Sequence, residues 1–314
     1  RSESTAIMIG TGHNVDAMIA AQELKGRSLW LDARGRLLRN RAAVAGMVIL
    51  ALIAILAVLA PLLSPYAYDE VNYDIIGCAP GWWPVEAACT APGHIFGTDS
   101  VGRDLFVRTL YGARVSLAVG LVATLVSLLI GVLYGAVAGY LGGRIDALMM
   151  RIVDVLYSLP FIFFVIILMV IFDRNFVLLF VAIGAVEWLT MARIVRGQTL
   201  SIKQKEFIEA ARAAGVSPLG IILRHVVPNV VGPVMVYVTL TVPGVILTES
   251  FLSFLGMGIQ EPLTSWGVLI SDGADQMETA PWMLLFPALF MAVTLFCFNF
   301  VGDGLRDATD PKDR

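Results

Sequence analysis

The chain has 314 residues, of which 58% are hydrophobic and only 15% are charged, and its mean hydropathy is +0.80. This composition exceeds the apolar fraction of soluble domains and predicts an all-α integral membrane protein, because lipid cannot satisfy the backbone groups of a loop or an open strand. A net charge of −3 and scattered arginines offer no basic stripe for phosphates, which argues against nucleic acid as a partner.

The N-terminal segment divides into two parts. Residues 1–26 are polar and unpatterned, so we expect a loosely ordered cytoplasmic tail, and Ala6 to Ile9 is too short an apolar run for a cleavable signal. In residues 27–41 leucine and tryptophan alternate with arginine, which predicts an amphipathic segment in the inner headgroup plane of the bilayer. A plain cationic anchor for the first span explains the same residues equally well.

Six stretches can cross a hydrocarbon core, which takes about 20 apolar residues. Four of them are uncharged, whereas the third and fourth each carry one carboxylate and are joined by the polar turn Asp173-Arg174-Asn175. In chain order the predicted spans are Ala42 to Leu63, Val115 to Gly143, Ile152 to Phe172, Asn175 to Ala192, Asn229 to Thr248 and Thr279 to Gly302.

The distribution of lysine and arginine predicts the orientation of these spans. With a cytoplasmic N-terminus, the inner segments hold 18 cations and the outer segments hold three, Arg103, Arg108 and Arg174. We therefore expect a multi-pass membrane protein with both termini in the cytoplasm.

The first outer loop, residues 64–111, is rich in Pro, Gly and Trp and predicts a small cap made of turns. Cys78 and Cys89 fall within it, so a disulfide is expected if the loop faces an oxidising compartment, and two unpaired thiols are the alternative. Asp99, Arg103 and Asp104 precede the second span. We expect them to cap helix ends and to pair with one another, in preference to binding a cation.

The stretch "EFIEAARAAGVSPLGIILRHVVPN", residues 206–229, predicts two short helices between two apolar spans. Ala210 and Ala211 leave little bulk beside Glu209, so the first helix suits close approach to another surface. Gly215 is a usual helix stop, and Ser217 with Pro218 is a good N-cap and first-turn pair.

The second of these helices is amphipathic, and Pro228 is expected to end it before the next span starts at Asn229. Its predicted apolar face consists of Leu219, Ile222, Leu223, Val226 and Val227. On residue spacing alone, an ordinary cytoplasmic loop and a segment that transmits force explain both helices equally well.

Carboxylates at membrane depth are costly unless they are paired or hydrated, so Asp154, Glu187 and Glu249 are candidates for lining a transport pathway. Interhelical hydrogen bonding is the alternative role for each. Gly131, Gly135 and Gly139 recur at intervals of four, which favours close helix packing over contact with a substrate.

These residues resemble a known family. Glu209-Ala210-Ala211, Gly215 and Pro228 resemble the coupling loop of the permease subunits of ABC importers, and "FGTDSVGRDL", "ARIVRGQTLS", "ESFLSFLGMG" and "PLTSWGVLISDG" resemble the peptide and dipeptide branch. The similarity covers roughly residues 27–314. The segments "NRAAVA" and "CFNFVGDGLRDATDPKDR" are more similar to the C-type subunit of the oligopeptide permeases than to its dipeptide relative.

The resemblance implies six transmembrane helices in the type I permease fold, with residues 112–314 as the permease core and 197–229 as the coupling loop. It implies a second homologous permease subunit, two ATP-binding subunits, an extracytoplasmic substrate-binding protein and a peptide substrate. Glu209 would be the polar contact to the ATPase, with Ala210 and Ala211 giving close fit and Gly215 the bend, while Ser217 and Pro218 would begin the second arm.

The sequence itself offers no means of catalysis. It contains no Gly-Lys pair, so no phosphate-binding loop for ATP is present, and neither H-E-x-x-H nor G-x-S-x-G occurs. We expect no enzyme, no cofactor and no metal. The alternatives are a secondary transporter or channel that uses the intramembrane carboxylates, a structural scaffold, or an importer for another peptide-like solute or a metal chelate.

Overall fold

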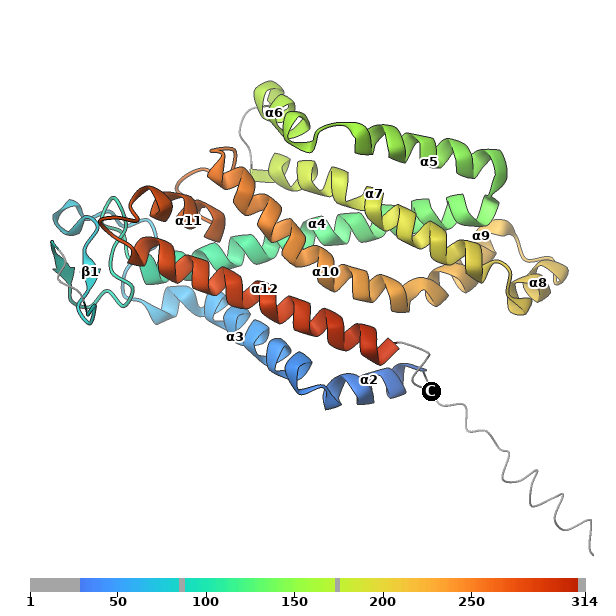
Figure 1. Ribbon diagram of the computed structural model, residues 1–314, viewed down its shortest axis with the longest axis horizontal. Coiled ribbons are helices and arrows are strands. Elements are labelled where there is room, and N and C mark those ends of the chain that lie inside the picture. Colours follow the sequence, from blue (N-terminus) through green and yellow to red (C-terminus); the bar gives the residue numbers. More distant parts are fainter. Residues whose placement is uncertain (1–28, 85–87, 173–175, 310–314) are drawn as a thin grey trace, which may run out of the picture.

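The structure, a computed structural model, describes residues 29–84, 88–172 and 176–309 (Figure 1). The predicted tail 1–26 and the turn Asp173-Arg174-Asn175 lie outside these ranges. The described part is an elongated helical bundle with a small cap at one end. Its helices are α2 (Leu29–Arg39), α3 (Arg41–Leu63), α4 (Leu105–Leu141), α5 (Gly143–Ser158), α6 (Phe161–Phe172), α7 (Phe176–Ile202), α8 (Glu206–Ala213), α9 (Pro218–Ile221), α10 (Val227–Phe254), α11 (Trp266–Asp275) and α12 (Trp282–Thr309).

Four of the described helices are long and apolar enough to cross a membrane, namely α3, α4, the continuous helix Pro218–Phe254 and α12. The predicted span Ile152 to Phe172 is not a single straight helix, because α5 and α6 meet there at an angle of 79°. Pro160 disfavours helical backbone at the preceding residue, and Leu159 is extended with ψ 129°. If the bent pair counts as one span, the described residues contain five candidate spans. The predicted number of six spans is therefore not confirmed.

The boundaries of two predicted elements move for local reasons. α4 begins at Leu105, ten residues before the predicted span, because the Asp104 carboxylate accepts a hydrogen bond from Val107 N at 2.7 Å and caps the helix. α2 ends before Asn40, whose side chain caps α3 by accepting from the backbone N–H groups of Ala42 and Ala43. The predicted interfacial segment therefore contains a helix separate from the first span.

The glycines of α4 form the closest contact in the bundle. A Cβ atom at Gly131 would lie 2.6 Å from Met191 Cβ, and one at Gly135 would lie 2.4 Å from Ala192 O. A Cβ at Gly139 would lie 2.7 Å from Thr199 Cβ. The predicted role of these glycines in close helix packing is confirmed, and the partner is α7, which runs alongside α4 (Figure 1).

α3 and α4 are joined by an arginine that compensates for a proline. Pro61 lies inside α3 and has no N–H, so the carbonyl of Ala57 loses its intrahelical donor. Arg114 of α4 donates from Nε to that carbonyl and from Nη2 to Val58 O at 2.8 Å. Its guanidinium also lies 4.3 Å from the centre of the Tyr111 ring.

We expect Arg114→Leu to lower the melting temperature of the purified chain in detergent, because two carbonyls at an apolar depth lose a charged donor worth about 1.5–3 kcal/mol each. Arg114→Lys should retain part of the stability, since the ammonium still reaches one carbonyl. An unchanged melting temperature in Arg114→Leu would show that the kinked helix does not need this donor.

The predicted outer loop forms a cap that a two-stranded sheet and a disulfide stabilise. β1 (Ala79–Pro80) pairs in parallel with β2 (Thr90–Ala91), and next to them a disulfide joins Cys78 to Cys89 with the Cα atoms 4.9 Å apart. Trp83 and Phe96 of this loop pack against the first turns of α12. The cap is thus part of the folded structure at the end of the bundle opposite α8 (Figure 1).

Reduction of this disulfide should loosen the cap by about 3 kcal/mol, the loop-closure entropy regained by the open chain. Limited proteolysis of the outer loop in proteoliposomes should become faster with reductant. A Cys78→Ser/Cys89→Ser chain should be cleaved at the fast rate with or without reductant, and the third cysteine, Cys297, is buried. Equal protection of oxidised and reduced chains would contradict this expectation.

Candidate coupling site

The coupling segment, residues 206–229, begins with α8, a helix of eight residues that places two carboxylates in its first turn. Gly215 has φ +78°, which an L side chain rarely adopts, and it lets Val216 N donate back to Ala211 O at 3.1 Å. Ser217 then caps the next helix by accepting from Gly220 N at 3.2 Å, with Pro218 in the first position. The bend lies at residues 215–217, where the sequence indicates it.

One face of α8 is buried in the bundle and the other is exposed. Ile208 is fully buried and Ala211 is 8% exposed, in a cluster with Ile221, Ile222 and Val226. Glu209 and Ala210 lie on the exposed side. The structure therefore separates the two alanines that the sequence assigned to one contact: Ala210 is free to approach a partner, whereas Ala211 packs inside this chain.

The arm after the bend differs from its prediction. Pro228 does not end the helix, which runs without a break from Pro218 to Phe254. Residues Ile222–Val226 form a π-helical turn in which Val227 N donates to Ile222 O. Pro228, which has no N–H, therefore follows a turn in which the usual hydrogen bonds to the fourth preceding residue are already replaced by bonds to the fifth. A continuous helix therefore connects the bend directly to the membrane-spanning part of α10.

The predicted apolar face of this arm is only partly correct. Ile222 and Val226 are buried, but Leu219 is 62% exposed and Leu223 is 47% exposed. Phe207 on α8 is 43% exposed as well. We call Phe207, Glu209, Ala210, Leu219 and Leu223 the coupling surface. Apolar side chains exposed beside a carboxylate, on the polar end of a membrane protein, are typical of a surface that another protein covers.

Polar contacts join the coupling segment to α4 and join the neighbouring helices to one another. The Arg212 guanidinium of α8 donates to the Tyr140 hydroxyl at 3.4 Å and lies 5.4 Å from its ring centre. Lys203, just before α8, donates to Gly139 O at 2.8 Å. Arg196 of α7 forms two hydrogen bonds, of 2.5 and 2.7 Å, with the Asp146 carboxylate of α5. Displacement of α8 therefore acts directly on α4 through Tyr140, while α5 and α7 are joined to each other at the same end of the bundle.

The structure does not bring the three predicted pathway carboxylates together. Asp154 is on α5 and pairs with Arg193 of α7 at 2.8 Å, with both side chains exposed. Glu187 is half-buried on α7. Glu249 of α10 is fully buried and accepts from Ser253 Oγ at 2.7 Å and from Ser265 Oγ at 2.6 Å.

Glu249 thus connects α10 to the start of α11, because Ser265 is also the N-cap of that helix. Of the three carboxylates it is the one that lies inside the chain and away from any open surface. This geometry matches the interhelical role that the sequence left open for it.

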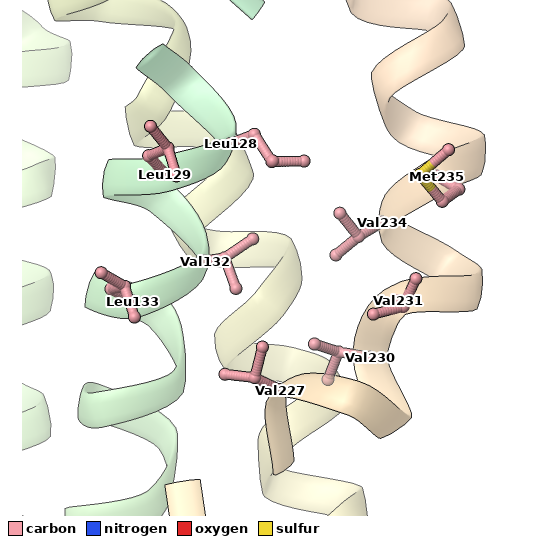
Figure 2. A pocket seen from close by; sticks show the side chains of 9 residues that line it. All are labelled: Leu128, Leu129, Val132, Leu133, Val227, Val230, Val231, Val234 and Met235. Atoms are coloured by element: carbon pink, nitrogen blue, oxygen red, sulfur yellow. The ribbon is translucent and has the colours of Figure 1, made fainter. Parts of the chain in front are cut away.

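An apolar groove of about 270 Å³ lies between α4 and α10, and Val227 of the coupling segment is one of its lining residues (Figure 2). Val132 of α4 and Val234 of α10 face each other across it. The nine lining side chains are Leu128, Leu129, Val132, Leu133, Val227, Val230, Val231, Val234 and Met235. A groove lined only by such side chains has no group that would bind the charged ends of a peptide.

The outer cluster at the start of α4 contains more residues than the sequence predicted. Asp99 pairs with Arg103 at 2.7 Å and Asp104 caps α4, so the predicted pairing and capping are confirmed. The additional members are His94, whose Nδ1 lies 2.7 Å from Asp104 Oδ2, and Arg108, whose Nε lies 3.2 Å from Asp99 Oδ2. A cation in the first turn of a long apolar helix needs such a partner, and this signal could have identified Arg108.

A carboxyl group of α11, the helix that precedes α12, also interacts with this cluster. Burial raises the pKa of the Asp272 carboxyl above its ordinary value, and the nearby Arg108 guanidinium acts in the opposite direction. Arg103 also reaches Glu261, at 2.8 Å, in the loop before α11. The start of α4 is therefore linked by charged groups to α11 and to the loop that precedes α11.

Comparison with known proteins supports what the geometry indicates. Residues 127–314 match the family described as binding-protein-dependent transport system inner membrane component, and residues 28–80 match the N-terminal TM domain of oligopeptide transport permease C. The oligopeptide transport system permease protein OppC of Escherichia coli K12 is 63% identical over 93% of this chain and 94% of its own length.

Two further relatives extend the comparison. OppC of Haemophilus influenzae is 56% identical over 94% of this chain and 93% of its own, and the dipeptide permease DppC of Bacillus subtilis is 47% identical over 90% and 86%. The chain therefore belongs to the family of binding-protein-dependent transport inner membrane components and, within it, to the C-type permeases of the oligopeptide transport systems.

Proposed function

We propose that the chain is the C-type permease of an ATP-driven importer of oligopeptides. Together with a second, homologous permease it forms the route through the bacterial inner membrane. Two separate ATP-binding subunits drive it, and an extracytoplasmic binding protein delivers the peptide. The relatives named as oligopeptide permeases, which match nearly the whole chain, support the substrate class.

The observation that carries this proposal is the continuity between the coupling surface and the membrane bundle. Glu209 and Phe207 are exposed on α8, and the bend at Gly215 leads without a break into the helix that ends at Phe254. Closure of two ATPase subunits would move α8 and therefore α10, since only the bend at residues 215–217 separates α8 from the continuous helix Pro218–Phe254. Glu209 would pair with a basic residue of the ATPase.

The residues of the chain indicate which part of transport it performs and which part the ATPase subunits perform. It has no phosphate-binding loop and uses no ATP itself. Its part is alternating access, in which the bundle opens first to the outer and then to the inner side. The excess of cations in the segments next to α8 supports a cytoplasmic location for the coupling surface and for both termini.

The test is peptide uptake by the reconstituted complex of the two permeases, the ATPase subunits and the binding protein. We expect ATP-dependent uptake that vanadate blocks and a protonophore does not. Uptake that persists with vanadate and collapses with the protonophore would indicate a secondary transporter. Uptake of a metal chelate with no uptake of peptides would refute the proposed substrate while leaving the ATP-driven mechanism in place.

A further inference from the structure

α5 has three distinct faces. Asp146 and Val153 are buried toward the rest of the bundle. A second face is apolar and exposed, and its members are Ile145, Leu148, Ile152 and Val155. The third face is exposed and polar, and its members are Arg144, Arg151, Asp154 and Ser158. At 3.6 residues per turn the two exposed faces adjoin each other along the helix.

The two exposed faces require different surroundings. Four large aliphatic side chains on one face suit the acyl region of a bilayer, whereas exposed charged groups do not. α5 therefore has lipid against its apolar face and water or polar protein against its polar face. Arg144 and Arg151 belong to the part of this face predicted to lie at the inner side, and Asp154 and Ser158 fall within the predicted span. α3, on the opposite edge of the bundle (Figure 1), has no such polar face: its exposed residues include Val48, Leu52, Ile55, Val58 and Leu62.

α7 extends the polar face of α5. Arg193 reaches across to Asp154 at 2.8 Å, and its guanidinium lies 4.5 Å from the ring centre of Tyr157, which is 52% exposed. The Arg193 side chain is 40% exposed and the Asp154 side chain is 57% exposed, so the pair is accessible to a molecule that lies beside α5 and α7. An aromatic ring beside an ion pair can contact both the backbone and the side chains of an extended peptide.

Arg151 differs from the other charged groups at this face. It is exposed and lies one turn before Asp154, but within the described ranges it makes no ion pair, because Asp154 is engaged by Arg193 and Asp146 by Arg196. A guanidinium offers a planar pair of donors that fits a carboxylate. Every linear peptide with a free C-terminus carries one such carboxylate, whatever its sequence.

We propose that the polar face of α5 lines the peptide's route beside the second permease, and that Arg151 binds the C-terminal carboxylate of the passing peptide. This inference rests on the proposed function as a peptide importer. The Asp154–Arg193 pair with Tyr157 forms the adjoining wall and contacts the peptide backbone. The apolar face of α5 keeps the route closed against lipid.

The test compares a peptide with a free C-terminus and the same peptide amidated, in the reconstituted complex with one binding protein throughout. The ratio of the two uptake rates is measured for the wild type, Arg151→Gln, Arg151→Lys and the control Arg34→Gln, an exposed arginine of α2. Loss of a charged hydrogen bond predicts about a tenfold slower uptake of the free peptide in Arg151→Gln, with little change for the amidated one.

Arg151→Lys should keep part of the preference, and Arg34→Gln should behave as wild type. ATPase activity without peptide, measured in each variant, reports assembly of the complex. A wild-type ratio in an assembled Arg151→Gln complex, or equal slowing of both peptides, would overturn the assignment. Failure of the proposed function would be visible in the wild type as a lack of ATP-driven uptake, before any variant is compared.

Discussion

Replacement of Glu209 by lysine is expected to abolish ATP-driven peptide uptake while the chain remains in the membrane. Glu209 is exposed on α8 and makes no described contact that the fold needs, so reversal of its charge acts on the partner rather than on the bundle. A cation placed against a basic residue of the ATPase turns an attraction into a repulsion of several kcal/mol. Uptake should fall at least a hundredfold.

The matched control is Glu278→Lys, the same charge reversal at an exposed carboxylate between α11 and α12. We expect this chain to bind the ATPase subunits normally. Both variants are compared by co-purification of the ATPase and by uptake rate. Normal uptake in Glu209→Lys, with the ATPase still bound, would show that the carboxylate plays no part in coupling.

The largest effect on stability is expected at Gly135, where α4 touches α7. A methyl group there would lie 2.4 Å from Ala192 O and 2.9 Å from Arg196 N, both backbone atoms that cannot move without the helix. Gly135→Ala should therefore cost about 3 kcal/mol or more through overpacking, although alanine favours a helix more than glycine does. The measurement is the melting temperature of the purified chain in detergent.

Gly197→Ala is the matched control, because nothing lies within 4 Å of a Cβ at Gly197 on the facing helix α7. Here the higher helix propensity of alanine acts alone, so the melting temperature should stay constant or rise slightly. Equal melting temperatures for the two variants would mean that α4 and α7 are less tightly packed than the structure has them.

The sequence predicted the parts of the fold that depend on short-range chemistry. The bend at Gly215, the cap at Ser217 and the packing role of Gly131, Gly135 and Gly139 all follow from properties of those residue types, whatever the tertiary context. The long apolar helices follow equally directly from hydropathy.

The errors arose where neighbouring turns or distant helices decide the outcome. Pro228 interrupts an ideal α-helix, but a π-turn before it accommodates the missing donor, and spacing does not reveal such a turn. The bend at Pro160 was hidden by the continuous apolar composition around it. Arg114 received no role because its acceptors on α3 are more than 50 residues away in the chain.

The central claim, that a separate ATPase contacts the coupling surface, is tested most directly by a site-specific crosslink. Ala213 is exposed at the end of α8, and the native cysteines are either disulfide-bonded or buried, so Ala213→Cys adds a single reactive thiol. In the assembled complex a short thiol-to-amine reagent should join this position to the ATPase subunit. The same reagent on Glu278→Cys should not. A crosslink from Glu278→Cys to the ATPase and none from Ala213→Cys would contradict the account.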